Sequence, residues 1–287
     1  KTRQHFIVAD IRSERRMTRI FNEYKPEIIF HAAAYKHVPL MEDNTYEAVN
    51  VNIIGAQIVM DLAVKYDVEK FVMISTDKAV NPTNVMGATK RIAELYSMCL
   101  KNTGRTKFIT TRFGNVLGSN GSVIPLFKRQ IDAGGPLTVT HRDITRYFMT
   151  IPEACQLVLE AVAMGKGGEI YVFDMGESIK IFDLALNMIQ LSGFKYPDEI
   201  DIIITGLRPG EKIHEELLAN DENTLPTYND KIMIAEVKDK DVTDIRKNII
   251  ELCLLSKGCD NLAIVKKIKE IVPEYISNNS EFEILDA

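Results

Sequence analysis

The sequence predicts an α/β protein in which a doubly wound parallel sheet carries helices on both faces. Short apolar runs alternate along the chain with longer segments whose apolar residues recur at helical spacing. Strands that alternate with helices in this way form a parallel sheet with right-handed crossovers. Beyond about Gly118, glycine and proline separate shorter elements, which indicates a smaller second lobe. We therefore expect residues 1–118 to form the first lobe, to which the chain returns near residues 150–176. Residues 119–276 should form the second lobe, and residues 277–287 a polar tail.

The elements of the first lobe follow from local patterns. The run 70–75 (Lys-Phe-Val-Met-Ile-Ser) is apolar like a strand that is buried on both faces. The three alanines at 32–34 are small, so the chain there can either pass close to a ligand or pack tightly against a neighbouring segment. The predicted strands are short and cover residues 5–9, 26–31, 70–75, 107–112 and 168–174. The predicted helices have apolar residues at helical spacing and cover residues 13–24, 44–66, 84–100 and 152–164.

Composition excludes several classes of protein. The 287 residues include 46% apolar and 26% charged residues, as in ordinary globular proteins, and the net charge of −5 argues against nucleic acid as a partner. The cysteines show neither Cys-x-x-Cys pairs nor histidines at metal-ligand spacing, so we expect reduced thiols and no metal site. No apolar run long enough to span a bilayer and no signal peptide is evident, which favours a cytoplasmic protein.

Candidate catalytic residues gather at one strand-to-helix junction. Residues 75–82 (Ser-Thr-Asp-Lys-Ala-Val-Asn-Pro) follow the strand at 70–75, at the carboxyl end where open α/β sheets bind ligands. Met86 and Lys90 lie one helical turn apart, so both can address one bound molecule. A thioether cannot donate or accept a titratable proton. Asp77 and Lys78 are therefore the nearest candidates for acid and base.

These residues belong to a set of segments that resembles one enzyme family. The segments cover residues 31–39, 75–82, 86–90, 112–119, 144–150 and 206–212. In order and spacing they resemble the nucleotide-sugar 4,6-dehydratases of bacterial capsule, O-antigen and protein-glycosylation pathways, which belong to the extended short-chain dehydrogenase/reductases. The likeness is greatest to the long-form UDP-N-acetylglucosamine 4,6-dehydratases, in which methionine replaces the usual tyrosine of Tyr-x-x-x-Lys. It covers nearly the whole chain.

The resemblance implies a Rossmann-like fold, a bound and recycled NAD or NADP, and a UDP-sugar substrate. Hydride leaves C4, water is lost across C5 and C6, and hydride returns to C6. Thr76 would contact the C4 oxygen, and Asp77, its pKa raised by burial, would be the acid for the C6 hydroxyl. Lys78, its pKa lowered, would be the C5 base, and Lys90 would hold the nicotinamide ribose. The acceptor of the C4 proton stays open between Asp77, Thr76 and a water held by Lys90.

Each assignment has a structural alternative. Thr76 would then simply end a strand, Asp77 would form an Asx turn or helix cap, and Lys78 and Lys90 would be solvated lysines. Besides the dehydratase, two other functions fit the pattern less well: a nucleotide-sugar epimerase or reductase of the same fold, and a non-catalytic dinucleotide-sensing protein.

The resemblance also assigns binding residues. For the cofactor they are Asp10, Ile11, Ala32, Ala33, Ala34, Lys36, Asn52, Ser75, Lys90, Arg112, Phe113 and Gly114. For the substrate they are Lys78, Met86, Asn115, Val123, Lys128, Arg146, Arg208 and Glu211. Arg208 is the best candidate for the diphosphate because a guanidinium matches phosphate oxygens bidentately. We expect Glu211 to orient Arg208 or to meet a ribose, and Arg146 to form either a structural ion pair or a substrate contact.

The beginning of the chain departs from the family pattern. A dinucleotide fold normally opens with a Gly-x-Gly-x-x-Gly turn, and none precedes the predicted strand at 5–9. Either no dinucleotide binds, or the opening βαβ unit is missing from this chain; the intact later segments favour the second interpretation. NAD therefore cannot be told from NADP. In long-form relatives a membrane-embedded region precedes this domain, and we expect the full-length protein to be membrane anchored and homo-oligomeric.

Overall fold

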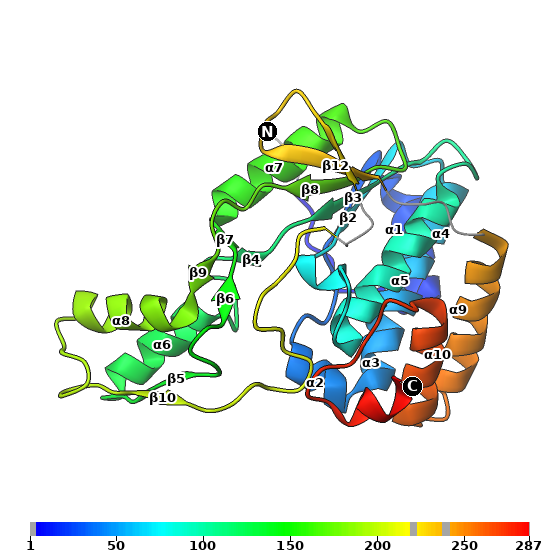
Figure 1. Cartoon of the computed structure of the whole chain (residues 1–287). Helices are drawn as coiled ribbons and strands as arrows, with labels where there is room; N and C mark the ends of the chain where they lie inside the picture. The colour runs from blue at the N-terminus through cyan, green and yellow to red at the C-terminus, as the bar shows by residue number, and fades with distance from the viewer. Residues whose placement is uncertain (1–3, 219–222, 237–241, 287) are drawn as a thin grey trace.

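The computed structural model describes residues 4–218, 223–236 and 242–286. A six-stranded sheet forms the centre of the larger lobe, in the order β1-β2-β3-β8-β12-β11 (Figure 1). Its parallel strands are β1 (Ile28–His31), β2 (Lys70–Ile74), β3 (Lys107–Arg112) and β8 (Ile170–Phe173). The strands β12 (Ile232–Glu236) and β11 (Asn223–Pro226) extend it antiparallel. The predicted α/β class is confirmed, and the antiparallel edge is an addition to the predicted parallel sheet.

Helices cover both faces of this sheet because its strands are apolar on both sides. On one face Phe71 and Phe108 are buried in a core that includes α4 (Ala56–Lys65) and α5 (Val85–Leu100). On the other face Val72 and Ile109 contact the core under α7 (Ile151–Met164). Successive side chains of a strand point to opposite faces, so each strand supplies both cores. The helix α1 (Glu14–Tyr24), predicted over residues 13–24, lies beside α4 and is capped by Ser13.

The predicted helix at 44–66 is continuous but not uniform. It consists of α3 (Thr45–Ala48), the π-helical stretch η1 (Val49–Gly55) and α4. The preceding α2 (Val38–Asp43) was not expected from the sequence; Pro39 at its start suits the first turn of a helix because its φ is fixed. Among the described residues, Thr45–Lys65 is long and apolar enough to cross a membrane, but 56% of its most apolar window is buried inside the protein. Length and composition are therefore weak evidence for a membrane span here.

The predicted strand at 5–9 is wrong. Residues 4–10 have no regular secondary structure, and Phe6 and Val8 are 94% and 97% exposed. A strand needs a neighbour for its backbone hydrogen bonds, and among the described residues β1 pairs only with β2.

The smaller lobe lies to one side of the sheet (Figure 1). It contains α6 (Val123–Asp132), β5 (Leu137–Val139), α8 (Ile181–Leu191) and β10 (Ile202–Ile204), with Phe127 and Ile189 buried between them. Two short pairs join it to the larger lobe: β4 (Asn115–Val116) with β7 (Phe148–Met149), and β6 (Thr145–Arg146) with β9 (Ile179–Lys180).

The C-terminal part of the expected second lobe lies elsewhere. The strands β11 and β12 belong to the main sheet, and α9 (Val242–Ser256) and α10 (Asn261–Ile271) cover the same core as α5. The expected polar tail is also anchored, because η3 (Glu281–Leu285) buries Phe282 completely in that core. Apolar side chains at helical spacing explain this return to the larger lobe. We therefore propose two lobes in which the chain re-enters the first at β11.

Candidate active site

A cleft of about 550 Å³ opens between the lobes where β1, β2 and β3 end. Small or polar residues that follow these strands form one wall, and residues of α6, β5 and the start of α8 form the other. The predicted site residues that line the cleft are Ala32, Ala34, Lys36, Ser75, Thr76, Lys78, Met86, Lys90, Phe113, Gly114, Asn115, Val123, Arg146, Arg208 and Glu211. Residues that the sequence assigns to one site therefore come together on one cleft, while their assignment to cofactor or substrate stays a prediction.

The turn η2 (Asp77–Ala79) presents the proposed acid and base. Thr76 caps this turn: its Oγ1 accepts from the backbone N of Lys78 at 3.4 Å and donates to Oδ1 of Asp77 at 2.7 Å. The backbone N of Asp77 donates to the carbonyl of Phe113 at 3.2 Å, which fastens the turn to the end of β3. The capping residue is thus Thr76, which leaves the Asp77 carboxylate available for other contacts.

Asp77 is buried behind the surface of the cleft. It is 1% exposed, and its Oδ2 has no hydrogen-bond partner among the described residues. Gly114 lies against this oxygen, since a Cβ there would be 3.2 Å from it. A buried carboxyl oxygen without a partner is costly, so it marks a position where function outweighs stability.

Lys78 is surrounded by oxygen atoms. Its Nζ lies 3.0 Å from Oδ1 of Asp77, 3.3 Å from Oδ1 of Asn115 and 3.3 Å from Oε1 of Glu215. Burial disfavours the charged amine, but the carboxylates of Asp77 and Glu215 outweigh burial and raise the pKa of Lys78 above its ordinary value. The predicted lowering of this pKa is therefore wrong, because the sequence indicated desolvation but not the second carboxylate.

The helix α5, which follows the turn η2 in the chain, supplies further residues of the cleft. Asn84 caps it by accepting from the backbone N of Gly87 at 2.8 Å, and Met86 and Lys90 both line the cleft, as their spacing predicts. Nζ of Lys90 donates to the carbonyl of Ile74 at 2.7 Å. Burial lowers the pKa of Lys90 to about 8. This lysine is a buried cleft residue, not a solvated one.

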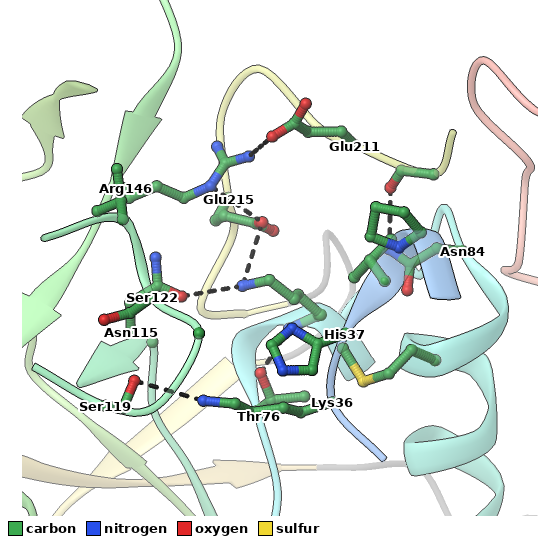
Figure 2. A pocket seen from close by; sticks show the side chains of 18 of the residues that line it. Lys36, His37, Thr76, Asn84, Asn115, Ser119, Ser122, Arg146, Glu211 and Glu215 are labelled. Atoms are coloured by element: carbon green, nitrogen blue, oxygen red, sulfur yellow. Dashed lines mark hydrogen bonds and ion pairs between the residues drawn. The ribbon is translucent and has the colours of Figure 1, made fainter. Parts of the chain in front are cut away.

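A chain of alternating charges leads from Lys78 to the cleft mouth. Figure 2 shows the guanidinium of Arg146 between Glu211 and Glu215. Its Nη2 is 3.4 Å from Oε1 of Glu211, and its Nε is 3.7 Å from Oε1 of Glu215. Glu211 also pairs with Arg208 at 3.1 Å, and the Arg208 side chain is 58% exposed. Glu211 thus orients Arg208 as expected, and Arg146 forms the ion pairs that the sequence left as one of two alternatives.

Some predicted cofactor residues lie outside the cleft lining. The Arg112 side chain is fully buried and paired with Glu94 at 2.8 Å, so a cofactor could meet only its backbone. Asn52 holds both backbone groups of Tyr35, at 2.8 and 3.0 Å, and so shapes the cleft wall indirectly. The other predicted residues that do not line the cleft are the cofactor residues Asp10, Ile11 and Ala33, the catalytic residue Asp77, which is buried behind the surface of the cleft, and the exposed substrate residue Lys128. Among the described residues, no cluster of His, Cys, Asp and Glu could hold a metal ion.

Glu215 was not predicted from the sequence. This glutamate lines the cleft and contacts Lys78, yet it lies beyond the segment 206–212 and next to the half-exposed Glu216. The only indication of a site role in the sequence is that Glu215 lies three positions after the segment 206–212. Asn84, which joins α5 to the carbonyl of Gly210 at 3.0 Å, was also missed.

Comparison of the sequence with known proteins agrees with this geometry. The sequence model of a family described as "Polysaccharide biosynthesis protein" matches residues 1–237. The capsular polysaccharide biosynthesis protein CapD of Staphylococcus aureus is 58% identical over 217 residues, which cover 75% of this chain and 36% of CapD. The inverting UDP-N-acetylglucosamine 4,6-dehydratase of Campylobacter jejuni is 36% identical over 227 residues, covering 78% of this chain and 64% of that enzyme.

An epimerase is similar to the same degree. The UDP-glucose 4-epimerase of Rickettsia conorii is 38% identical over 221 residues, covering 76% of this chain and 62% of that enzyme. The chain thus spans less than two thirds of the length of each of these relatives.

Solved structures share the fold. Pen from Bacillus thuringiensis superposes with a TM-score of 0.75 at 34% identity, covering 86% of this chain and 81% of Pen. DesIV, a dTDP-glucose 4,6-dehydratase from Streptomyces venezuelae solved with NAD, gives a TM-score of 0.64 at 22% identity, covering 75% and 69%. The second likeness concerns the fold alone.

Proposed function

This chain belongs to the polysaccharide biosynthesis protein family, and from that premise we propose that it is the catalytic part of a UDP-N-acetylglucosamine 4,6-dehydratase. The enzyme would be a lyase of the extended short-chain dehydrogenase/reductase type. The observation that carries the proposal is the contact of Asp77 with Lys78 at 3.0 Å beside the cleft, with Met86 where a phenol would otherwise lie. Loss of water needs an acid and a base near C5 and C6, whereas epimerisation exchanges a hydride and a proton at C4 alone.

The cleft fits a nicotinamide dinucleotide. The cleft wall at the ends of the strands has small residues that leave room for a ligand, namely Ala32, Ala34 and Gly114. Polar groups line the same cleft at Ser75 and Lys90. We assign Lys90 to the nicotinamide ribose. When bound, NAD or NADP would accept the hydride from C4 and return it to C6. Nζ of Lys90 is buried beside the cleft and donates to the carbonyl of Ile74 at 2.7 Å, and its other N–H groups could donate to a ribose hydroxyl.

Thr76 and Asp77 form the acid side of the reaction. The hydroxyl of Thr76, which donates to Oδ1 of Asp77 at 2.7 Å, gives a path for the C4 hydroxyl proton to reach that carboxyl. Asp77 then gives a proton to the C6 hydroxyl, which leaves as water. This path favours Thr76 among the alternatives for the C4 proton.

The substrate diphosphate belongs at Arg208. Its guanidinium is the exposed end of the charge chain, and Glu211 holds it from behind. Asn115, which would donate to the same diphosphate, and Val123 also line the cleft. We also propose a cytoplasmic, homo-oligomeric enzyme whose full-length form is anchored to the membrane outside this chain.

The test is incubation with UDP-N-acetylglucosamine and mass spectrometry of the product. The dehydratase yields a keto sugar lighter by one water. Asp77→Asn, which preserves side-chain shape, should lower turnover by about 10² to 10⁴-fold with an unchanged melting temperature, because general acid catalysis is lost. Near-normal turnover would remove Asp77 from this role.

The same assay judges the alternatives. Similarity to the Rickettsia conorii epimerase favours epimerisation as second candidate, and its product keeps the substrate mass with C4 inverted. A dinucleotide-sensing protein would bind the dinucleotide and change no sugar.

A further inference from the structure

Glu215 is a buried carboxylate on the cleft whose role the proposed reaction does not yet explain. Its side chain is 3% exposed and its Oε2 has no hydrogen-bond partner among the described residues. Its Oε1 lies 3.3 Å from Nζ of Lys78 and 3.7 Å from Nε of Arg146. A carboxylate held only by these ion pairs keeps lone pairs free to take up a proton.

Lys78, as the structure holds it, cannot act as a base. An ammonium group has three donors and no lone pair, and three acceptors surround Nζ: Asp77, Asn115 and Glu215. The charged groups that face it are Asp77 on its own turn, Glu215 on the segment after β10, and Arg146 on β6. Taking a proton from C5 therefore requires that Lys78 first give one away within this cluster.

We propose that Glu215 is a positioning residue that acts through Lys78 by accepting its proton, an inference that rests on the proposed function. An N–H bond of Lys78 breaks and an O–H bond forms on Glu215, which leaves a neutral amine beside a neutral carboxyl group. The amine then takes the C5 proton, while the C5–H electrons move toward the C4 ketone. After hydride returns to C6, Lys78 gives the proton back to C5 and regains its own from Glu215, so protons balance over the cycle.

Two features favour Glu215 over Asp77 as the acceptor. Oδ1 of Asp77, the oxygen that faces Lys78, accepts hydrogen bonds from both Thr76 and Lys78, whereas among the described residues Oε1 of Glu215 makes only the longer ion-pair contacts with Lys78 and Arg146; the second oxygen of each carboxyl group has no partner there. Asp77 is also assigned to the C6 hydroxyl. When a sugar fills the cleft and excludes water, a neutral pair escapes the desolvation cost that an ion pair bears.

The first experiment needs no substrate. The reactivity of Lys78 toward acetic anhydride, followed by peptide mass spectrometry across a pH series, reports its neutral fraction. Glu215→Gln should raise Lys78 labelling at a fixed pH by about tenfold or more, because one of two nearby carboxylates is lost. The control is Glu216→Gln, whose carboxylate pairs with Lys212 and is 46% exposed. Equal labelling of Lys78 in both variants would overturn the proposal.

The second experiment follows deuterium entry from solvent at C5 of UDP-N-acetylglucosamine. In Glu215→Gln, a charged Lys78 has no acceptor for its proton once the sugar fills the cleft, so only enzyme whose Lys78 is already neutral when the sugar binds can take the C5 proton. Even with a roughly tenfold larger neutral fraction, that is a minority near neutral pH, so exchange should fall by about 10²-fold there and then rise about tenfold per pH unit. Wild type and Glu216→Gln should show fast exchange that varies little with pH. A loss that is equal at every pH would mean a merely structural role, and no loss would mean no role.

The two experiments separate the two proposals. If the wild type makes no keto sugar and exchanges no C5 proton, the proposed function fails. The labelling result still decides whether Glu215 controls the proton of Lys78.

Discussion

Gly87 should be indispensable because α5 touches the backbone of the turn η2, which carries the proposed acid and base, at this position. A Cβ at this position would lie 2.0 Å from the carbonyl oxygen and 2.9 Å from the carbonyl carbon of Lys78, where ordinary contact begins at 3.4 Å. In Gly87→Ala the helix and the turn must therefore separate by about 1.4 Å. Such overpacking costs about 1–3 kcal/mol, and the better helix propensity of alanine recovers up to about 1 kcal/mol.

The effect on turnover should exceed the effect on stability. A displacement of about 1 Å at a reacting group lowers rates by about 10²-fold, whereas the net loss of stability lowers the melting temperature by only a few degrees. Both are measured on one preparation, by keto-sugar formation and by thermal unfolding. The control is Gly104→Ala in the turn before β3, whose Cβ would meet only the side chain of Val64 at 3.3 Å. Wild-type turnover in Gly87→Ala would refute the close packing described here.

Two further predictions concern charge. Arg208→Ala should weaken UDP-sugar binding by about 10- to 100-fold, because a hydrogen bond to a charged group is lost. The control is Lys128→Ala, which lies outside the cleft lining and should change the affinity less than about twofold. Calorimetric titration measures both affinities, and equal losses in the two variants would contradict the prediction. Burial lowers the pKa of Lys90 from 10.5 to about 8, so between these values the unfolded chain binds more protons and stability rises with pH. Denaturant unfolding gives the difference in unfolding free energy between wild type and Lys90→Met. This difference should shift in favour of wild type by about 2 kcal/mol between about pH 8 and pH 10. A difference that stays constant over this range would argue against a buried amine.

Local patterns were sufficient for most elements of the parallel part of the sheet and for the strand-to-helix junction that borders the cleft. The predicted strand at 107–112 coincides with β3, and the helix predicted from 84 to 100 is α5 with its cap at Asn84. These predictions succeed because periodicity and capping depend on residues within a few positions of one another. The exposed segment at 5–9 failed for the same reason: its apolar residues show a strand pattern, but pairing needs a neighbouring strand that the pattern does not supply.

The sequence by itself determined the fold class, the alternation of strands and helices from residue 13 to residue 112, and the run that carries Thr76, Asp77 and Lys78. Only the tertiary structure decided which charges meet: Glu215 joins Lys78 from a distant segment, and Arg112 turns away from the cleft to Glu94. The physical reason is range. Helix and strand patterns are set by neighbours along the chain, whereas the protonation of Lys78 is set by carboxylates within a few ångströms in space, and those distances exist only after the lobes have packed together.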